Sequence, residues 1–229
     1  MAFFTNLSNE LKTPLSRIIA PISQLLPSTE EVHEKQTLEE VQRNAMKINS
    51  LIHQVLNFNR IEDNKDSLLI LSRIELVSFS RSLFSVYEED KRFTFHFEAN
   101  KAKIYADMDA IKLGVILDNL LSNAVKFTPD GGSVRLSLFY REETGLLDIC
   151  VSDTGSGIPQ QDIPYIFQRF FQSPHSGNKE GTGIGLYLVK TYTELHGGHI
   201  NGVTSNEGKG TSIGLNIPVI AVEKEEIPA

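Results

Sequence analysis

The feature that most restricts the fold of this chain is a helical segment rich in asparagine, followed by three clusters of glycine. Apolar residues recur at helical spacing from Met108 to Phe127, and Asn119, Asn123 and Lys126 fall on one face of this predicted helix. The glycine clusters are Asp153-Thr154-Gly155-Ser156-Gly157-Ile158-Pro159, Gly181-Thr182-Gly183-Ile184-Gly185-Leu186 and Gly208-Lys209-Gly210-Thr211. Each cluster alone indicates no more than a turn, although glycine also lets a ligand approach the backbone closely. Their order after the asparagine helix is far more specific than any one of them.

The residue types on this predicted helix suit a magnesium-bound triphosphate. Amide oxygens are hard ligands, and Mg²⁺ keeps several waters and takes substrate phosphates as further ligands. The second glycine cluster opens a predicted helix over 184–195, whose first backbone amides could meet phosphate oxygens. Neither a dinucleotide-binding βαβ unit nor a P-loop fits, because both need a different context around the glycines.

Alternating and periodic segments predict an α+β fold from residue 67 onward. Strands are expected at 93–97, 133–140, 146–152 and 212–219, and the second and third are joined by a Glu-Glu-Thr-Gly turn. With helices at 108–127 and 184–195, this order favours a two-layer α/β sandwich built on a mostly antiparallel sheet.

The first sixty residues predict a helical hairpin with two apolar stripes. The stripes consist of Phe4, Leu7, Leu11, Leu15, Ile18, Ile22 and Leu25, and of Leu38, Val41, Ala45, Ile48, Ile52, Val55 and Phe58. Association with a second copy into a four-helix bundle would bury both stripes, and packing on the rest of the chain is the alternative. A polar turn after Ile61 gives the expected division: a helical domain at 1–66, an α+β domain at 67–221 and a tail at 222–229.

Composition excludes several other classes of protein. The net charge is −7 and no long Lys/Arg run occurs, which argues against direct binding of duplex nucleic acid and against a polybasic membrane anchor. No apolar stretch approaches the roughly 20 residues that span a bilayer, and the first residues lack the pattern of a signal peptide. The single cysteine, Cys150, rules out a disulfide framework, and its apolar surroundings predict a buried thiol in a reducing compartment.

Taken with these motifs, the chain resembles the sensor histidine kinases of two-component systems, whose ATP-binding fold is shared with gyrase, mismatch-repair and heat-shock chaperone ATPases. The resemblance covers nearly the whole chain. It implies a cytoplasmic kinase core, with any membrane contact made through segments outside this sequence. It also implies ATP and Mg²⁺ as ligands, a homodimer, and the receiver domain of a response regulator as a partner.

The resemblance assigns roles to individual residues. Asp153 is expected to accept a hydrogen bond from the adenine amino group, and Asn123 is the expected direct Mg²⁺ ligand. The full set of implied nucleotide-binding residues is Asn119, Asn123, Lys126, Phe127, Asp153, Gly155, Gly157, Ile158, Arg169, Lys179, Gly181, Thr182, Gly183, Gly185, Leu186 and Thr211. Residues 167–171 resemble an aromatic box and residues 172–183 an ATP lid. For Arg169 and Lys179, contact with phosphates and simple solvation remain open alternatives.

One position departs from the family pattern. Residues 3–15 resemble the phosphoacceptor box, in which a histidine precedes the glutamate, but here Asn9 precedes Glu10. Asn9 lies about 200° around the helix from Leu7 and from Leu11, so the presented face is retained. An amide nitrogen is delocalised into its carbonyl and is not a useful nucleophile, so phosphorylation at position 9 should be absent. The six histidines are expected in surface or packing roles.

Three functions therefore compete. The first is a histidine kinase core in which Asn9 is either an engineered or a natural change. The second is a non-catalytic nucleotide-binding scaffold, or a response-regulator phosphatase in which Thr13 helps to orient the attacking water. The third, a chaperone- or gyrase-like ATPase, is disfavoured because those enzymes carry a glutamate general base at the position of Asn119.

Overall fold

The computed structural model describes residues 68–175 and 181–219, together with seven residues of the first 67. These seven are all helical, as the predicted hairpin requires: Arg17, Ile18, Ala20, Val41, Asn44, Ala45 and Ile48. The rest of the hairpin, its assembly into a bundle and the tail at 222–229 lie outside the described residues. The proposed limits of the domains therefore stay predictions. Within the described ranges, no helix is both long enough and apolar enough to cross a membrane.

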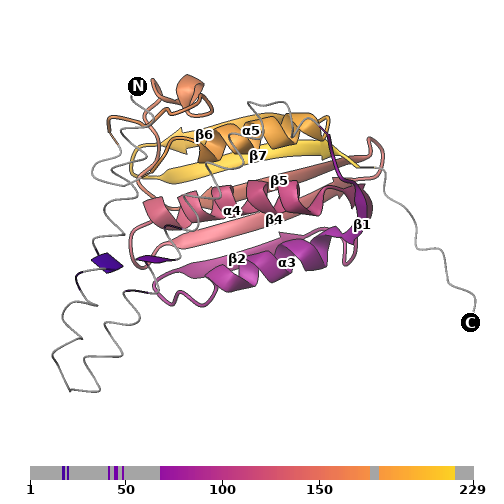
Figure 1. The fold of residues 1–229 in the computed structure, drawn as a ribbon, viewed down its shortest axis with the longest axis horizontal. Helices are drawn as coiled ribbons and strands as arrows, with labels where there is room; N and C mark the ends of the chain where they lie inside the picture. The colour runs from indigo at the N-terminus through magenta and orange to yellow at the C-terminus, as the bar shows by residue number, and fades with distance from the viewer. Residues whose placement is uncertain are drawn as a thin grey trace, which may run out of the picture.

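A five-stranded sheet forms the back layer of the α+β domain that follows the first 67 residues (Figure 1). Its strands, in spatial order, are β2 (Thr94–Ala99), β4 (Ser133–Arg141), β5 (Leu146–Asp153), β7 (Gly210–Pro218) and β6 (His199–Asn206). β2 pairs with β4 in parallel, and every other pair in this sheet is antiparallel. A separate antiparallel pair is formed by β1 (Ser72–Glu75) and β3 (Tyr105–Met108).

Three helices lie side by side across one face of the sheet (Figure 1). They are α3 (Leu76–Tyr87), α4 (Ala110–Phe127) and α5 (Gly185–Leu195), and a short 3₁₀ turn, η1 (Ile163–Tyr165), stands beside them. α4 is the middle helix, and its inward residues are almost fully buried against alternate residues of β4 and β5. The predicted two-layer α+β sandwich with a mostly antiparallel sheet is thus confirmed.

Five elements of the described ranges were not predicted from the sequence: β1, α3, β3, η1 and β6. α3 is capped by Glu75 and not by one of the usual cap residues Ser, Thr, Asp or Asn, so the sequence carries no clear start signal. The Glu75 carboxylate accepts hydrogen bonds from the backbone N–H groups of Val77 (3.0 Å) and Ser78 (2.8 Å). β1 and β3 have four residues each, too few for a clear alternation. In β6 the pairing with β7 shifts register between Ile200 and Gly202, and this irregularity obscures the alternation.

The prediction of a buried thiol at Cys150 is wrong. Alternation along β5 places Cys150 on the sheet face opposite the helices, where it is half-buried. Its Sγ lies 3.2 Å from the Ser212 Oγ, which itself lies 3.0 Å from the Ser152 Oγ. The apolar run around Cys150 indicates a strand, but only every second residue of that run faces the core.

Two isoleucines on α4 test whether burial of this helix stabilises the domain. Ile116 is fully buried and Ile111 is 77% exposed. We expect Ile116→Ala to lower the free energy of unfolding by about 2–5 kcal/mol, because it leaves a cavity in the core. Ile111→Ala, the matched control, should change it by less than about 0.5 kcal/mol. Urea unfolding followed by circular dichroism measures both, and equal effects would contradict the packing described here.

Candidate functional site

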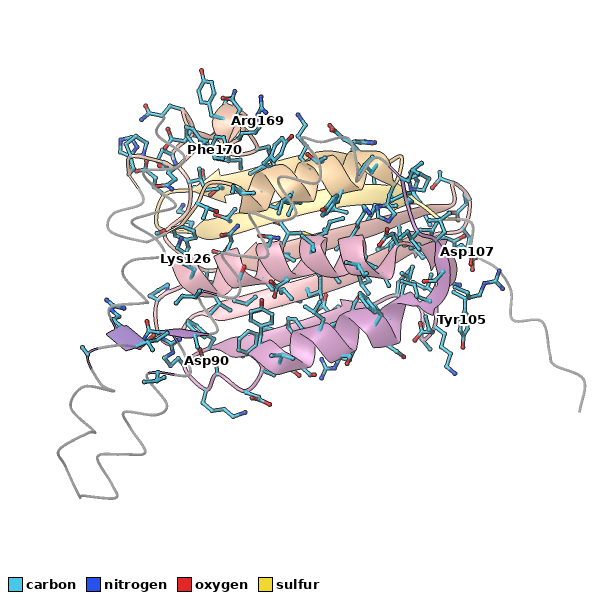
Figure 2. The ribbon with its side chains drawn as sticks, in the orientation of Figure 1. Asp90, Tyr105, Asp107, Lys126, Arg169 and Phe170 are labelled. Carbon is cyan, nitrogen blue, oxygen red and sulfur yellow. The ribbon has the colours of Figure 1, made fainter. Side chains whose placement is uncertain are left out.

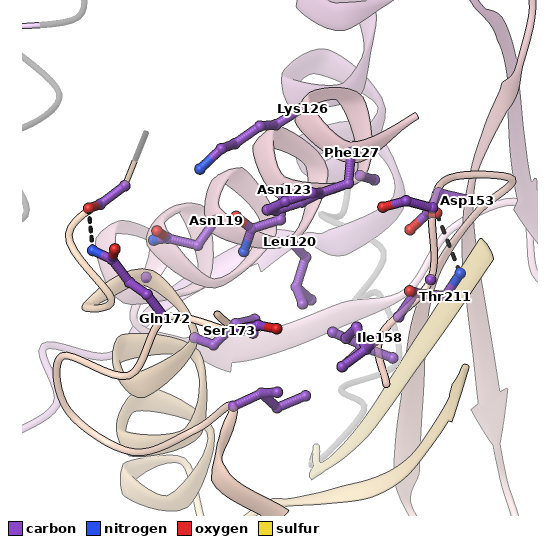
Figure 3. A pocket seen from close by; sticks show the side chains of 18 of the residues that line it. Asn119, Leu120, Asn123, Lys126, Phe127, Asp153, Ile158, Gln172, Ser173 and Thr211 are labelled. Atoms are coloured by element: carbon purple, nitrogen blue, oxygen red, sulfur yellow. Dashed lines mark hydrogen bonds between the residues drawn. The ribbon is translucent and has the colours of Figure 1, made fainter. Parts of the chain in front are cut away.

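A pocket of about 630 Å³ opens at the carboxyl-terminal end of α4 (Figure 3). One wall is the second half of α4, and the opposite wall is formed by the end of β5, the loop after it and the start of β7. The start of α5 and the loop before it close the remaining side. The lining thus combines segments that are far apart in the sequence, which the two-layer fold brings to one end of the domain.

The α4 wall presents the predicted polar residues on one face. Figure 3 shows Asn119, Asn123 and Lys126 along the same side of the helix. Asn119 Nδ2 donates a hydrogen bond to the Val115 carbonyl over 2.7 Å. A Cβ on Gly185 would lie only 2.5 Å from Asn119 Oδ1, so the glycine at this position lets the amide reach the first turn of α5. The Lys126 ammonium lies 4.9 Å from the centre of the Phe127 ring.

The opposite wall holds one carboxylate in a fixed orientation. Asp153 Oδ1 accepts a hydrogen bond from the Gly155 N–H over 2.8 Å. It accepts another from the Thr211 N–H over 3.2 Å, which Figure 3 shows as a dashed line. The two donors come from different segments, so the carboxylate joins the loop after β5 to the start of β7. A carboxylate is only an acceptor when ionised, so this wall suits a ligand that presents an N–H donor.

Gly183 has a left-handed backbone and lies in close contact with the aromatic segment. Its φ is +70°, and its carbonyl accepts a hydrogen bond from the Phe170 N–H over 2.9 Å. Phe170 itself has a φ of 62°, a conformation that is rare for a bulky side chain. Because such strain persists only where the surroundings impose it, the Gly183–Phe170 contact fixes the junction between this segment and the pocket.

Most of the predicted nucleotide-binding residues line this one pocket: Asn119, Asn123, Lys126, Phe127, Asp153, Gly157, Ile158, Gly181, Thr182, Gly183, Gly185, Leu186 and Thr211. Gly155 and Arg169 do not line it. Gly155 instead supports Asp153 from behind, and Arg169 lies in the segment near η1 (Figure 2). Lys179 and the acceptor-box residues Asn9, Glu10 and Thr13 lie outside the described residues.

The sequence interpretation placed residues 172–183 in an ATP lid but assigned no binding role to Gln172, Ser173 or His175, which line the far rim of the pocket. The Ser173 hydroxyl donates a hydrogen bond to Asp162 Oδ2, and His175 Nδ1 lies 3.3 Å from the same oxygen. Asp162 is buried and sits just before η1. These residues carry no periodic pattern, and their pairing depends on two loops meeting in space.

The pocket offers few anionic ligands for a metal ion. Within the described ranges, no group of three or more His, Cys, Asp or Glu side chains is arranged to hold one. A divalent cation here would take its protein ligands from amide oxygens and complete its shell with phosphate oxygens and water. Asn123, on the α4 wall, has the donor type that such a site requires.

Comparisons with known proteins match both halves of the chain. Residues 108–221 match the family model described as histidine kinase-, DNA gyrase B- and HSP90-like ATPase, and residues 1–64 match the His Kinase A (phospho-acceptor) domain. The chain is 34% identical to hybrid signal transduction histidine kinase D of Dictyostelium discoideum, over 95% of this chain and 14% of that protein. It is 32% identical to sensor histidine kinase WalK of Bacillus subtilis (strain 168), over 94% of this chain and 36% of that protein.

A solved structure shares the fold. Full-length ShkA in complex with AMPPNP aligns with a TM-score of 0.68 at 24% sequence identity, covering 96% of this chain and 46% of that one. The present chain therefore spans less than half the length of each of these three proteins.

Two glycines with similar backbone angles test the Gly183–Phe170 contact. A Cβ on Gly183 would lie 2.6 Å from the Phe170 carbonyl carbon, whereas a Cβ on Gly208 (φ +73°) would meet nothing within 4 Å. We expect Gly208→Ala to cost about 1–2 kcal/mol of unfolding free energy through its left-handed backbone alone. Gly183→Ala should cost more and should also weaken nucleotide binding, measured by urea unfolding and calorimetry. Equal costs for the two variants would contradict a tight contact at Gly183.

Proposed function

Because the chain belongs to the histidine kinase family, we propose that it is the catalytic core of a two-component sensor, which binds Mg-ATP in the pocket at the end of α4. The observation that carries this proposal is the juxtaposition of an oriented carboxylate, Asp153, with the amide and ammonium groups of α4 across one pocket. The two ends of the pocket suit the two ends of a nucleoside triphosphate, a base with an exocyclic amine and a chain of phosphates.

At the base-binding end, Asp153 would accept a hydrogen bond from the adenine amino group. Guanine presents a carbonyl oxygen at the corresponding ring position, which would face the carboxylate with no hydrogen between them. The two backbone amides that hold Asp153 Oδ1 keep the carboxylate in place without a ligand, so little orientation has to be established on binding. Ile158 and Thr211 lie beside it in the pocket lining.

At the phosphate end, the α4 residues would bind and orient the triphosphate. Asn123 would supply an amide oxygen to Mg²⁺, and Lys126 would hold a phosphate oxygen through its ammonium group. Mg²⁺ in this position would neutralise charge that develops on the transferred phosphoryl group. The first backbone amides of α5, which begins at Gly185, would stabilise the same negative charge.

The first domain would present the phosphoacceptor position, and here the chain departs from a working kinase. Asn9 stands where a histidine nucleophile is required, with Glu10 beside it to polarise an imidazole that is not present. The core would therefore bind ATP without phosphorylating itself at this position. We propose that it dimerises through the helices of residues 1–66 and contacts the receiver domain of a response regulator.

A second candidate function follows from the same position. Thr13 is retained while the nucleophile is not, and a hydroxyl there could orient water for dephosphorylation of a response regulator. The chain would then act as a phosphatase, or as a nucleotide-binding scaffold that signals through its conformation. A chaperone- or gyrase-like ATPase stays disfavoured, because Asn119 has no basic lone pair with which to activate water.

The carboxylate at the base-binding end makes the nucleotide proposal testable. In Asp153→Asn, the amide oxygen can still accept from Gly155 and Thr211, but an NH₂ group replaces the second oxygen. We expect at least tenfold weaker ATP binding by calorimetry, about 1.4 kcal/mol or more, since a charge-assisted hydrogen bond is lost. Asp130→Asn, at an aspartate whose side chain is 75% exposed, is the control and should bind ATP as the parent does. Unchanged binding in Asp153→Asn would contradict the assigned orientation.

Restoring the nucleophile tests the role of the first domain. We expect Asn9→His to acquire radiolabel from [γ-³²P]ATP as an acid-labile, base-stable phosphoramidate, while the parent chain stays unlabelled. Asn9→Gln should also stay unlabelled, because its amide is no better a nucleophile. Label on the parent would reveal another acceptor, with His53 as the first suspect. A failure of Asn9→His to label despite intact ATP binding would favour the scaffold or phosphatase.

A further inference from the structure

A buried ion pair lies at the end of α4 opposite the pocket. The Lys112 Nζ lies 3.1 Å from Asp109 Oδ2, and the two side chains are 8% and 4% exposed. Asp109 also caps α4, because its Oδ1 accepts a hydrogen bond from the Lys112 N–H over 3.0 Å. In Figure 2 the labelled Asp107 marks this end of the molecule and Lys126 marks the other. About 20 Å of helix separates the pair from Asn123.

The pair binds the backbone of the connecting segment, residues 68–71, through which the chain passes from the first domain into β1. The Ile70 N–H donates a hydrogen bond to Asp109 Oδ2 over 3.0 Å, and the Lys112 ammonium donates one to the Leu68 carbonyl over 3.3 Å. Apolar packing holds this segment only weakly, because Leu68, Ile70 and Leu71 are between 56% and 77% exposed and only Leu69 is half-buried. The polar contacts with its backbone therefore contribute strongly to the position of the segment.

His196, the residue directly after α5, makes a hydrogen bond to the backbone of Asp109. His196 Nε2 accepts a hydrogen bond from the Asp109 N–H (3.3 Å), and its Nδ1 donates one to the Tyr192 carbonyl (2.7 Å). Burial and, to a smaller extent, the nearby Lys112 charge lower the pKa of His196, while the Tyr192 carbonyl and Asp109 act in the opposite direction. The pKa is lowered overall, so the ring is neutral, as its acceptor role at Nε2 requires. Burial alone would raise the pKa of Asp109, but hydrogen bonds from Lys112 and Ile70 lower it overall, so the carboxylate stays charged.

Such an arrangement does more than stabilise the core. A buried ion pair often contributes no more stability than apolar residues of the same size, since both charges lose their hydration. Here the two charged groups are each shared between their partner and a backbone group of the connecting segment. The start of α4, the end of α5 and the connecting segment are thereby joined at one point.

We propose that Asp109 and Lys112 are positioning residues that fix the direction in which the chain enters the ATP-binding domain. This proposal rests on the proposed function, because the direction of entry sets how the pocket meets the phosphoacceptor helix. Phosphoryl transfer between two domains requires the reacting groups to be held in one relative orientation. If the connecting segment could adopt many directions, the rate of phosphoryl transfer would fall. Nucleotide affinity should not depend on the pair, since the pocket lies at the other end of α4.

The variant that isolates this role is Asp109→Asn in the full chain carrying Asn9→His. Asparagine is as good a helix cap as aspartate, and its oxygen can still accept from the Lys112 N–H. The NH₂ group that replaces Oδ2 cannot accept from the Ile70 N–H and cannot pair with Lys112. Asp107→Asn is the matched control, because Asp107 is a half-exposed neighbour that pairs with Arg73 rather than with the connecting segment.

Three measurements distinguish positioning from simple stability. We expect Asp109→Asn to keep its ATP affinity within twofold, to lose amide hydrogen-exchange protection at residues 68–71, and to phosphorylate at least tenfold more slowly at saturating ATP. The loss should thus fall on kcat and not on KM, whereas Asp107→Asn should match its parent in all three. Lost protection with an unchanged rate would overturn the proposal.

Lys112→Met is a second variant for which we expect the same three results. Loss of ATP binding in both Asp109→Asn and Lys112→Met would overturn the proposal, because it would show that the pair is purely structural.

A distance measurement separates this proposal from the proposed function. Double electron–electron resonance between nitroxides at positions 17 and 130 reports the distance between the two domains. The labelled chain carries Cys150→Ala and is diluted with unlabelled chains. We expect Asp109→Asn to broaden the distance distribution with or without Asn9→His, because the effect needs no chemistry. An unchanged distribution would overturn the positioning role. Failure of Asn9→His to label, with a distribution that still broadens in Asp109→Asn, would count against the kinase function alone.

Discussion

The burial of α4 across the middle of the sheet is the constraint on which the rest of the domain depends. Leu113, Ile116, Leu117, Leu120 and Leu121 are each no more than 2% exposed, so the helix can neither rotate nor slide without opening the core. Because α4 cannot rotate about its axis, the direction of its polar face is fixed as well. Asn119, Asn123 and Lys126 are therefore held toward the pocket by apolar contacts on the opposite side of the same helix.

The two ends of α4 consequently have different tasks. The carboxyl-terminal half supplies one wall of the pocket, and the first residues hold the segment that arrives from the other domain. A rigid helix keeps these two places at a constant separation and relative angle. Any change in how the connecting segment attaches would alter the direction from which the first domain approaches, while the chemistry of the pocket stays the same.

Sequence reasoning succeeded where one local pattern was strong enough to decide a structure. The apolar spacing of 108–127 gave α4 with a start only two residues early, because Asp109 caps the helix and ends the preceding strand at Met108. The family resemblance assigned the glycine clusters to one nucleotide site, and Gly157, Gly181, Gly183 and Gly185 line the pocket. β1 and β3 escaped prediction since each is stabilised by pairing with the other, at a separation of about thirty residues that no local pattern reveals.

The same reasoning explains why the candidate site was predicted only in part. The type and spacing of Asn119, Asn123 and Lys126 suggest a magnesium-bound triphosphate. The resemblance to histidine kinases implies the finer roles of Asn123 and Asp153. Gly155 shows the limit of this approach: its glycine cluster suggested ligand contact, but its amide is directed at Asp153 and fixes the carboxylate from behind. Which glycine meets a ligand and which one supports a neighbour depends on the direction of a single N–H bond. The Gly155 N–H is directed at Asp153 by the turn directly after β5, whereas the Thr211 N–H reaches the same oxygen because β7 pairs with β5, a contact that no local pattern reveals.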